Sequence, residues 1–168
     1  MTLTYTWEAP DVRQFADDWA RSLPVILQEL ERAMTESLAI VESNVVGRTP
    51  VNTGFLRQSI GHRMRGTPGA IEGEVVSIAS YAAPVEYGRK PGKWPPRDAI
   101  EYWVRRKLKI TNDAEVRSVA FLIARKIGLK GTKGAEMFQE GLQVSRPHIE
   151  KAIDRALARI ENRLMGND

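Results

Sequence analysis

The chain of 168 residues contains no cysteine. This absence excludes a disulfide-stapled scaffold, thiol catalysis and any metal site that needs a thiolate ligand. Histidine is nearly as scarce, because His62 and His148 are the only two and neither lies in a cluster with metal-ligand spacing. No stretch reaches the roughly eighteen consecutive apolar residues of a membrane span, and the first residues lack the features of a signal peptide. We therefore expect a soluble protein made in the cytoplasm, with no membrane segment, metal or cofactor.

Catalytic patterns are missing as well. The acidic residues of the first sixty positions are spread at the spacing of a solvent-exposed helix face, so none pairs as a general acid and base. Gly128, Gly131 and Gly134 stand in a basic segment, but Lys133 occupies the position where a phosphate-binding loop needs its second glycine. A flexible basic loop over 128–134 is favoured there. We therefore expect a protein that is not an enzyme.

Composition is otherwise that of a globular protein, with 42% apolar and 27% charged residues. A chain of this length is typical of one domain, so we expect a single domain over 1–168. The net charge of +4 is unevenly spread. Residues 1–60 hold five basic and eight acidic residues, whereas residues 97–133 hold ten basic and four acidic ones. A basic centre of this kind suits a polyanion or an acidic protein partner, although a solvated helix face is the simpler interpretation.

The pattern of apolar residues predicts an α+β fold, with a small antiparallel sheet packed against a long N-terminal helix, a C-terminal helix and an inserted helical pair. Residues 1–10 form an N-terminal arm in which Leu3, Tyr5 and Trp7 alternate with threonine. A first helix follows from Asp11, and Pro24 is best placed in the first turn of a second one. The expected elements are a long helix over 24–46, a hairpin over 60–80, a helical pair over 96–127 and a C-terminal helix over 146–165.

The helical pair carries two features of its own. Asn112 with Glu115 three residues later predicts a capped helix start. Beyond its main apolar stripe, the second helix of the pair, which begins after Asn112, has Phe121 and Leu122 on another side. This indicates deep burial or a subunit contact. A helix-turn-helix that reads DNA is disfavoured, because the middle of the second helix is Val-Ala-Phe-Leu-Ile-Ala. The alternative function kept open is a basic nucleic-acid-binding module that uses residues 97–127, tested at Arg105, Arg106 and Lys107.

Three motifs follow one another along the chain. The first reads Thr-Pro-Val-Asn-Thr-Gly-x-Leu-Arg-x-Ser-Ile over 49–60, the second Tyr-Ala-x-x-Val-Glu-Tyr-Gly over 81–88, and the third Gly-Thr-Lys-Gly-x-x-x-Phe over 131–138. In this order the sequence resembles the tail-completion or head–tail joining proteins of long-tailed bacteriophages, the minor tail protein Z-like family. It departs from that family at Arg89, Glu136 and Met137, and its middle is longer. The motif positions that carry the resemblance most directly are Thr53, Gly54, Leu56, Ser59, Tyr81, Val85, Glu86, Gly88, Gly131, Thr132 and Phe138.

The resemblance implies a structural protein of the virion neck, located at the head–tail junction. It would complete the tail and join it to the DNA-filled head as a homo-oligomeric ring, hexameric by resemblance, around the DNA channel. Its implied partners are head-side connector or adaptor proteins, the tail terminator or tail tube protein, and packaged double-stranded DNA through non-specific contacts. The residues we expect to face the DNA lumen or a partner are Arg63, Arg65, Arg89, Lys90, Lys93, Trp94, Lys130 and Lys133.

Overall fold

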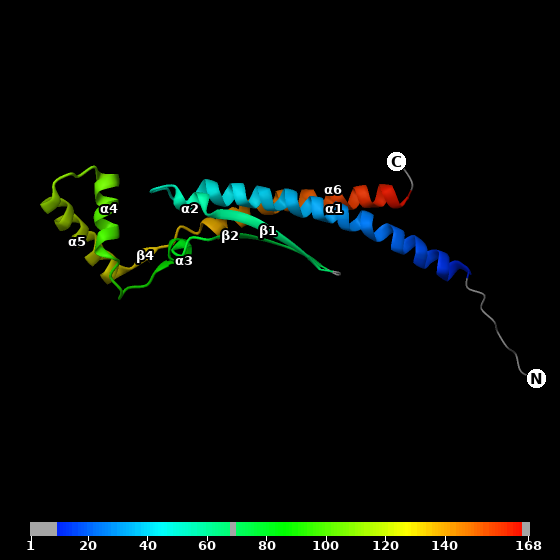
Figure 1. Cartoon of the computed structure of the whole chain (residues 1–168), viewed down its shortest axis with the longest axis horizontal. Helices are drawn as coiled ribbons and strands as arrows, with labels where there is room; N and C mark the ends of the chain where they lie inside the picture. The colour runs from blue at the N-terminus through cyan, green and yellow to red at the C-terminus, as the bar shows by residue number, and fades with distance from the viewer. Residues whose placement is uncertain (1–9, 68–69, 166–168) are drawn as a thin grey trace, which may run out of the picture. The chain divides into compact units, whose positions relative to one another are not determined.

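The structure is a computed structural model that describes residues 10–67 and 70–165. The α+β class expected from the sequence is confirmed, since long helices accompany two small sheets (Figure 1). The expected N-terminal arm lies almost wholly outside the described residues. The elements in chain order are α1 (Pro10–Arg48), α2 (Phe55–Gln58), β1 (Ile60–Thr67), β2 (Ala70–Ser77), α3 (Ala82–Tyr87), β3 (Gly88–Arg89), α4 (Arg97–Leu108), α5 (Asp113–Lys130), β4 (Thr132–Lys133) and α6 (Met137–Leu164).

Two predicted helix starts were wrong, both at a proline. The structure has one continuous helix α1 through Pro24, and α6 begins at Met137 and runs through Pro147. A proline inside a helix lacks the N–H that would bond the carbonyl four residues earlier. In both cases that earlier residue, Ala20 or Gln143, is exposed, so water can hydrate the carbonyl. The long apolar faces of both helices then outweigh a local cost of about 3 kcal/mol.

The β structure is smaller and more divided than the sequence predicts. Strands β1 and β2 pair in one two-stranded sheet, within the range expected for a hairpin. A second sheet pairs β3 with β4 in antiparallel register, with Gly88 opposite Lys133 and Arg89 opposite Thr132. The prediction of a flexible loop over 128–134 was therefore wrong. The reason is that α5 extends to Lys130 and the following residues pair with a strand more than forty positions earlier, which local sequence cannot indicate.

Tertiary contacts divide the chain into two compact units. Unit 1 comprises residues 1–37, 64–73 and 147–168, and unit 2 comprises residues 38–63 and 74–146. The expectation of a single domain stays a prediction.

In unit 1, α1 and α6 pack together through small side chains, and their antiparallel pairing is held by ion pairs. Ala33, Ala152 and Ala156 are buried there. Glu29 is buried as well, and it accepts a hydrogen bond from Arg159 Nε at 2.5 Å, with Arg163 Nη1 at 3.3 Å. The contact between α1 and α6 in unit 1 thus combines small apolar side chains with a buried ion pair.

In unit 2, α4 and α5 form a helical hairpin with its own apolar core. Val104, Val116 and Ala120 are buried at its centre. The predicted helix cap is confirmed, because Asn112 Oδ1 accepts hydrogen bonds from the backbone N–H groups of Ala114 and Glu115 at 3.0 and 3.1 Å. The hairpin is thus ordered by an ordinary cap and an ordinary core. The partly buried residues around that core are Ile100, Ile110, Val119 and Ile123.

Candidate functional site

The three sequence motifs meet in unit 2, at a place that we call the motif junction. It consists of the loop over 49–54 with α2, the helix α3 with β3, and the turn from β4 into α6. Residues of all three motifs lie in this one unit, although the first and the last are separated by more than seventy positions. The contacts that each motif residue makes in the junction therefore indicate its role.

The first motif connects the end of α1 to the first sheet. Thr49 is buried, and its Oγ1 donates a hydrogen bond to the Val45 carbonyl at 2.7 Å, while its own carbonyl accepts one from Arg57 Nε at 2.9 Å. Ser59 is buried beside β2 and lies 2.7 Å from Ser77, oxygen to oxygen. Helix α2 spans only four residues, and Leu56 is its buried side chain. Phe55 is exposed instead, with its ring 6.4 Å from that of Tyr81.

The second and third motifs are joined backbone to backbone. Gly88 and Gly131 adopt positive φ angles of 75° and 71°. A Cβ on Gly88 would lie 2.2 Å from the Thr132 carbonyl oxygen, one on Gly131 would lie 2.0 Å from that of Arg89, and one on Gly134 would lie 2.2 Å from that of Glu86. No side chain fits at such distances. The glycines of the two motifs therefore allow β3 and β4 to approach each other.

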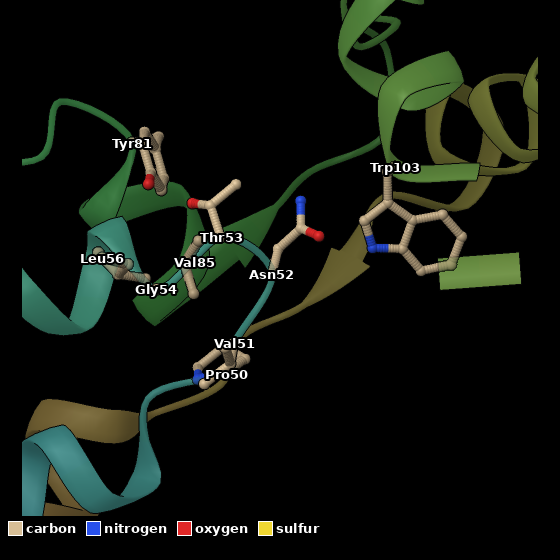
Figure 2. Close-up of a pocket in the computed structure, with 9 residues that line it drawn as sticks. All are labelled: Pro50, Val51, Asn52, Thr53, Gly54, Leu56, Tyr81, Val85 and Trp103. Carbon is tan, nitrogen blue, oxygen red and sulfur yellow. The ribbon is translucent and has the colours of Figure 1, made fainter. Parts of the chain in front are cut away.

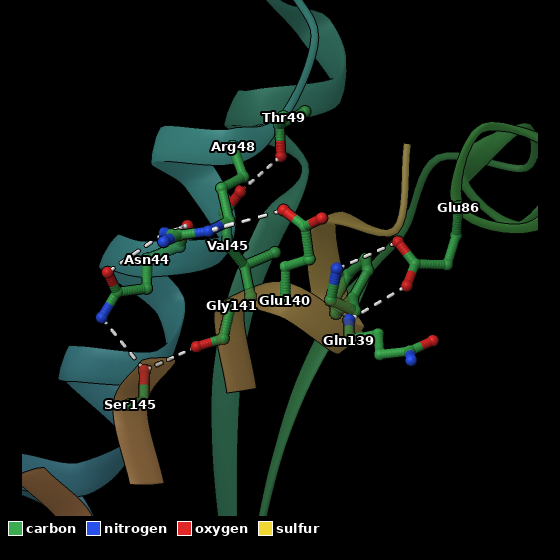
Figure 3. Close-up of polar contacts among 10 residues, drawn as sticks. Asn44, Val45, Arg48, Thr49, Glu86, Gln139, Glu140, Gly141 and Ser145 are labelled. Carbon is green, nitrogen blue, oxygen red and sulfur yellow. Dashed lines mark hydrogen bonds and ion pairs between the residues drawn. The ribbon is translucent and has the colours of Figure 1, made fainter. Parts of the chain in front are cut away.

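Glu86 ties the second motif to the start of α6. Its side chain is buried, and its two carboxylate oxygens accept hydrogen bonds from the backbone N–H groups of Phe138 at 2.9 Å and Gln139 at 3.1 Å (Figure 3). The first N–H groups of a helix have no partner within the helix, and a negative charge there is stabilised by the helix dipole. Glu86 is thus a capping residue supplied from fifty positions away. The backbone adds two more bonds, from Ala135 N to the Val85 carbonyl and from Glu136 N to the Glu86 carbonyl.

The beginning of α6 is pressed against the end of α1 at the same junction (Figure 3). A Cβ on Gly141 would lie only 2.6 Å from Val45 Cγ2. Beside this contact, Asn44 Nδ2 donates a hydrogen bond to Ser145 Oγ at 3.0 Å, and Ser145 Oγ donates one to the Gly141 carbonyl at 2.7 Å. The sequence did not predict Gly141 or Ser145 as a contact between the two helices. A glycine and a serine four positions apart in a helix were the signal available for close helix packing.

A pocket of about 190 Å³ opens beside the junction, and two motifs line it together with α4 (Figure 2). The loop over 50–54 runs between Tyr81 and Val85 on one side and Trp103 on the other. Asn52 Oδ1 is buried in this wall and has no hydrogen-bond donor among the described residues, whereas its backbone carbonyl accepts one from Arg106. The pocket thus offers a mostly apolar surface, and one acceptor without a donor is buried in its wall. Its lining residues are Pro50, Val51, Asn52, Thr53, Gly54, Leu56, Tyr81, Val85 and Trp103.

Six of the eight predicted contact residues gather around the second sheet. Arg89 and Lys133 lie on the paired strands β3 and β4. Lys90, Lys93 and Trp94 lie in the following loop, which is held on α5 by a hydrogen bond from Gly92 N to the Gly128 carbonyl and by the Trp94 ring against Gly128. Lys130 ends α5 close by. Arg63 and Arg65 lie on β1 instead, and Arg63 Nε contacts Glu74 Oε1 at 2.5 Å.

Cations of the helical pair are partly engaged within the fold. Arg105 Nη2 contacts Asp113 Oδ1 at 2.7 Å, and this hydrogen bond lowers the pKa of Asp113 below its ordinary value. Arg106 donates to the Asn52 carbonyl. Neither arrangement favours the alternative of a nucleic-acid-binding module. No group of three potential metal ligands occurs in residues 10–67 and 70–165.

Comparison with known protein families gives a match that includes the first two motifs. The family described as "Bacteriophage HK97-gp10, putative tail-component" matches residues 14–88, which is just under half of the chain. This segment is therefore similar to a family of bacteriophage tail components, and it contains the first two motifs. No curated protein and no solved structure matches the chain. Among the helices of the described part, none is long and apolar enough to cross a membrane.

Proposed function

We propose that this protein is a structural component of a bacteriophage particle that completes the tail and joins it to the DNA-filled head. The observation that carries the proposal is the family match over residues 14–88, which contains the first two motifs. The motif junction supports it, because the second motif is joined there to the third by hydrogen bonds and strand pairing, and to the first by the contact of Phe55 with Tyr81. The narrower role at the neck rests on the order of the three motifs.

The junction suits a structural role. Its charged group Glu86 caps α6, and its glycines lie in close backbone contacts. Such an arrangement holds the surrounding loops rigidly and leaves their side chains for neighbouring proteins. Phe55, Tyr81 and Trp103 are at least one-third exposed beside the pocket, and aromatic side chains are enriched at protein interfaces.

Partners follow from the same proposal. Copies of the chain would form a ring, hexameric by resemblance, between head-side connector or adaptor proteins and the tail terminator or tail tube. The exposed cations Lys90, Lys93, Lys130 and Lys133 would meet the phosphates of packaged DNA. Contacts of this kind hold DNA by charge alone and read no sequence, so a small number still lets the DNA slide.

The proposal is tested on purified particles of a phage that encodes this chain. Antibody raised against the folded protein, with gold label and electron microscopy, should mark the head–tail junction. Deletion of the gene should leave filled heads and finished tails that are not joined, and the purified protein added to such a lysate should restore joined particles. Label along the tail tube or at its far tip would contradict the neck role. Absence of the protein from particles by immunoblot would contradict the virion role altogether.

A further inference from the structure

Helix α5 has two apolar faces, and one of them is left exposed. The buried face packs on α4 around Val116 and Ala120. On the other side Phe121, Leu122 and Leu129 are 53%, 58% and 63% exposed. The ring of Trp94 extends this side, with its centroid 5.8 Å from that of Phe121 and half of its surface exposed. We call Trp94, Phe121, Leu122 and Leu129 the α5 stripe; large exposed apolar groups gathered in this way mark interaction surfaces.

Positive charge lies within and beside the α5 stripe. Arg125 lies one helical turn from both Phe121 and Leu129, and Lys126 and Lys130 follow on the same half of the helix. The acidic residues of α5 lie in its first turn, away from this half. DNA is a poor occupant, because the phosphate backbone gives leucine and phenylalanine side chains nothing to pack against. The surface that fits is an apolar one with an acidic border.

Unit 1 carries a surface with that chemistry. A groove of about 300 Å³ lies between α1, β2 and α6, and its walls are almost wholly apolar. Five exposed carboxylates stand next in sequence to its lining residues, against one exposed cation so placed, Arg32. Glu36 is one of them and pairs with Arg155. The others are Glu31, Glu72, Glu150 and Asp154. The lining residues, which we call the unit 1 groove, are Leu27, Leu30, Ala33, Met34, Ser37, Ala70, Ile71, Ile149 and Ile153.

The two units also differ in overall charge. Unit 1 has twelve acidic and eight basic residues, a net charge of −4, whereas unit 2 has nine acidic and seventeen basic ones, a net charge of +8. Two copies of the chain would therefore repel each other unit 2 to unit 2, and attract each other unit 2 to unit 1. The charge pattern and the apolar surfaces point to the same pairing.

We infer that the α5 stripe of one copy docks in the unit 1 groove of a second copy. Such a contact is head-to-tail, so each pair of copies keeps one unused stripe and one unused groove, and further copies can add until a ring closes. This inference rests on the proposed function, since it names the surfaces through which the subunits of the virion ring join. The charged borders guide the encounter, and the apolar centres supply most of the binding free energy.

The test uses the full chain and three sets of substitutions at exposed positions. The stripe variant carries Phe121→Ser, Leu122→Ser and Leu129→Ser. The groove variant carries Leu27→Lys and Ile153→Lys, whose wild-type side chains are 41% and 42% exposed. The control variant carries Tyr102→Ser and Leu108→Ser, which remove exposed apolar side chains from α4 outside the stripe. Circular dichroism and thermal unfolding first establish that all three variants fold.

Sedimentation velocity then measures association at low and high salt. Wild type and the control variant should associate with rising concentration, and salt should weaken that association. The stripe and groove variants should each associate at least about tenfold more weakly. Mixed together, they should form a dimer that grows no further, because the groove of the stripe variant and the stripe of the groove variant are both intact.

Three results would overturn the inference. One is a wild-type chain that stays monomeric at low salt up to roughly 100 µM, a limit that excludes all but very weak association. Another is a groove variant that dimerises as well as wild type, which would mean that stripes pair with stripes. The last is a mixture of the two variants that stays monomeric. None of these results bears on where the protein lies in the particle, so the proposed function fails or stands separately through the labelling experiment.

Discussion

Helices α1 and α6 meet in both units, and the two contacts are built from different chemistry. In unit 2 the contact is steric, because Gly141 lies against Val45 with no room for a further carbon atom. In unit 1 it depends on charge, because the buried Glu29 is held by Arg159 and Arg163. A steric contact is indifferent to pH and salt, whereas an ion pair is sensitive to both. The comparison predicts that acid and salt weaken the contact between the two helices in unit 1 and leave their contact in unit 2 unchanged.

The largest expected effect is at the second sheet of unit 2. Gly131→Ala places a Cβ at 2.0 Å from the Arg89 carbonyl oxygen, at a φ angle of 71° that side chains rarely adopt. We expect it to lower the free energy of unfolding by about 3 kcal/mol or more, measured by urea denaturation. The matched control is Gly47→Ala, where the Cβ meets nothing within 4 Å in a helix, and which should raise stability by up to about 1 kcal/mol. A loss below about 1 kcal/mol at Gly131 would contradict the close pairing of β3 with β4.

Next in size is the cap on α6. Glu86→Gln replaces one of two accepting oxygens by an NH2 group that faces a backbone N–H. We expect a loss of about 1–2 kcal/mol, with faster hydrogen exchange at Phe138 and Gln139. Glu140→Gln is the control, because that carboxylate is mostly exposed and its ion pair with Arg48 is long, at 4.0 Å. This substitution should change stability by less than about 1 kcal/mol. Equal effects of the two substitutions would show that Glu86 does not cap the helix.

The steric contact between the helices is tested by a double-mutant cycle. Gly141→Ala gains helix propensity but pushes a methyl group to 2.6 Å from Val45 Cγ2, and we expect a net loss of about 1–2 kcal/mol. In a Val45→Ala background that loss should shrink by about 1 kcal/mol, since the interfering methyl group is gone. Urea denaturation of the four proteins gives the coupling. Additive effects would mean that the helices are not in close contact at this position.

Removal of the charged contact in unit 1 should give the smallest change in stability at neutral pH, because both arginines remain partly in water. The change should also depend on pH in a characteristic way. The hydrogen bond from Arg159, helped by the charges of Arg159, Arg163 and Arg32, lowers the pKa of Glu29 below its ordinary value against the effect of burial. Its contribution is therefore complete above the ordinary glutamate pKa and is lost as pH falls through the lowered pKa.

Glu29→Gln should accordingly destabilise unit 1 near neutral pH, and the difference from wild type should shrink as the solution becomes acidic. Hydrogen exchange of unit 1 amides, followed between about pH 6 and pH 3, measures it. Glu36→Gln removes the exposed pair with Arg155 and serves as the control. A difference that stays constant over this range would mean that folding does not change the pKa of Glu29.

Local patterns predicted much of the fold and part of the site. The cap at Asn112 was predicted by residues three positions apart, because a cap is a local hydrogen bond. The helix starts at Pro24 and Pro147 were predicted wrongly, since local preference there is outweighed by packing along the whole helix. The motif residues were named, but their roles were not. That Glu86 caps α6 depends on a contact across fifty-two positions.

By itself the sequence determined the α+β class, the apolar stripes of the helices, the absence of thiol chemistry, and the difference in charge between residues 1–60 and 97–133. These properties follow from composition and from spacings of a few residues, which fix local conformation and solvation. Only the tertiary structure decided that Gly88 pairs with Lys133, that Gly141 packs against Val45, and that one face of α5 stays exposed. Such contacts join residues far apart in the chain, and their free energy comes from packing and desolvation that exist only once the chain has folded.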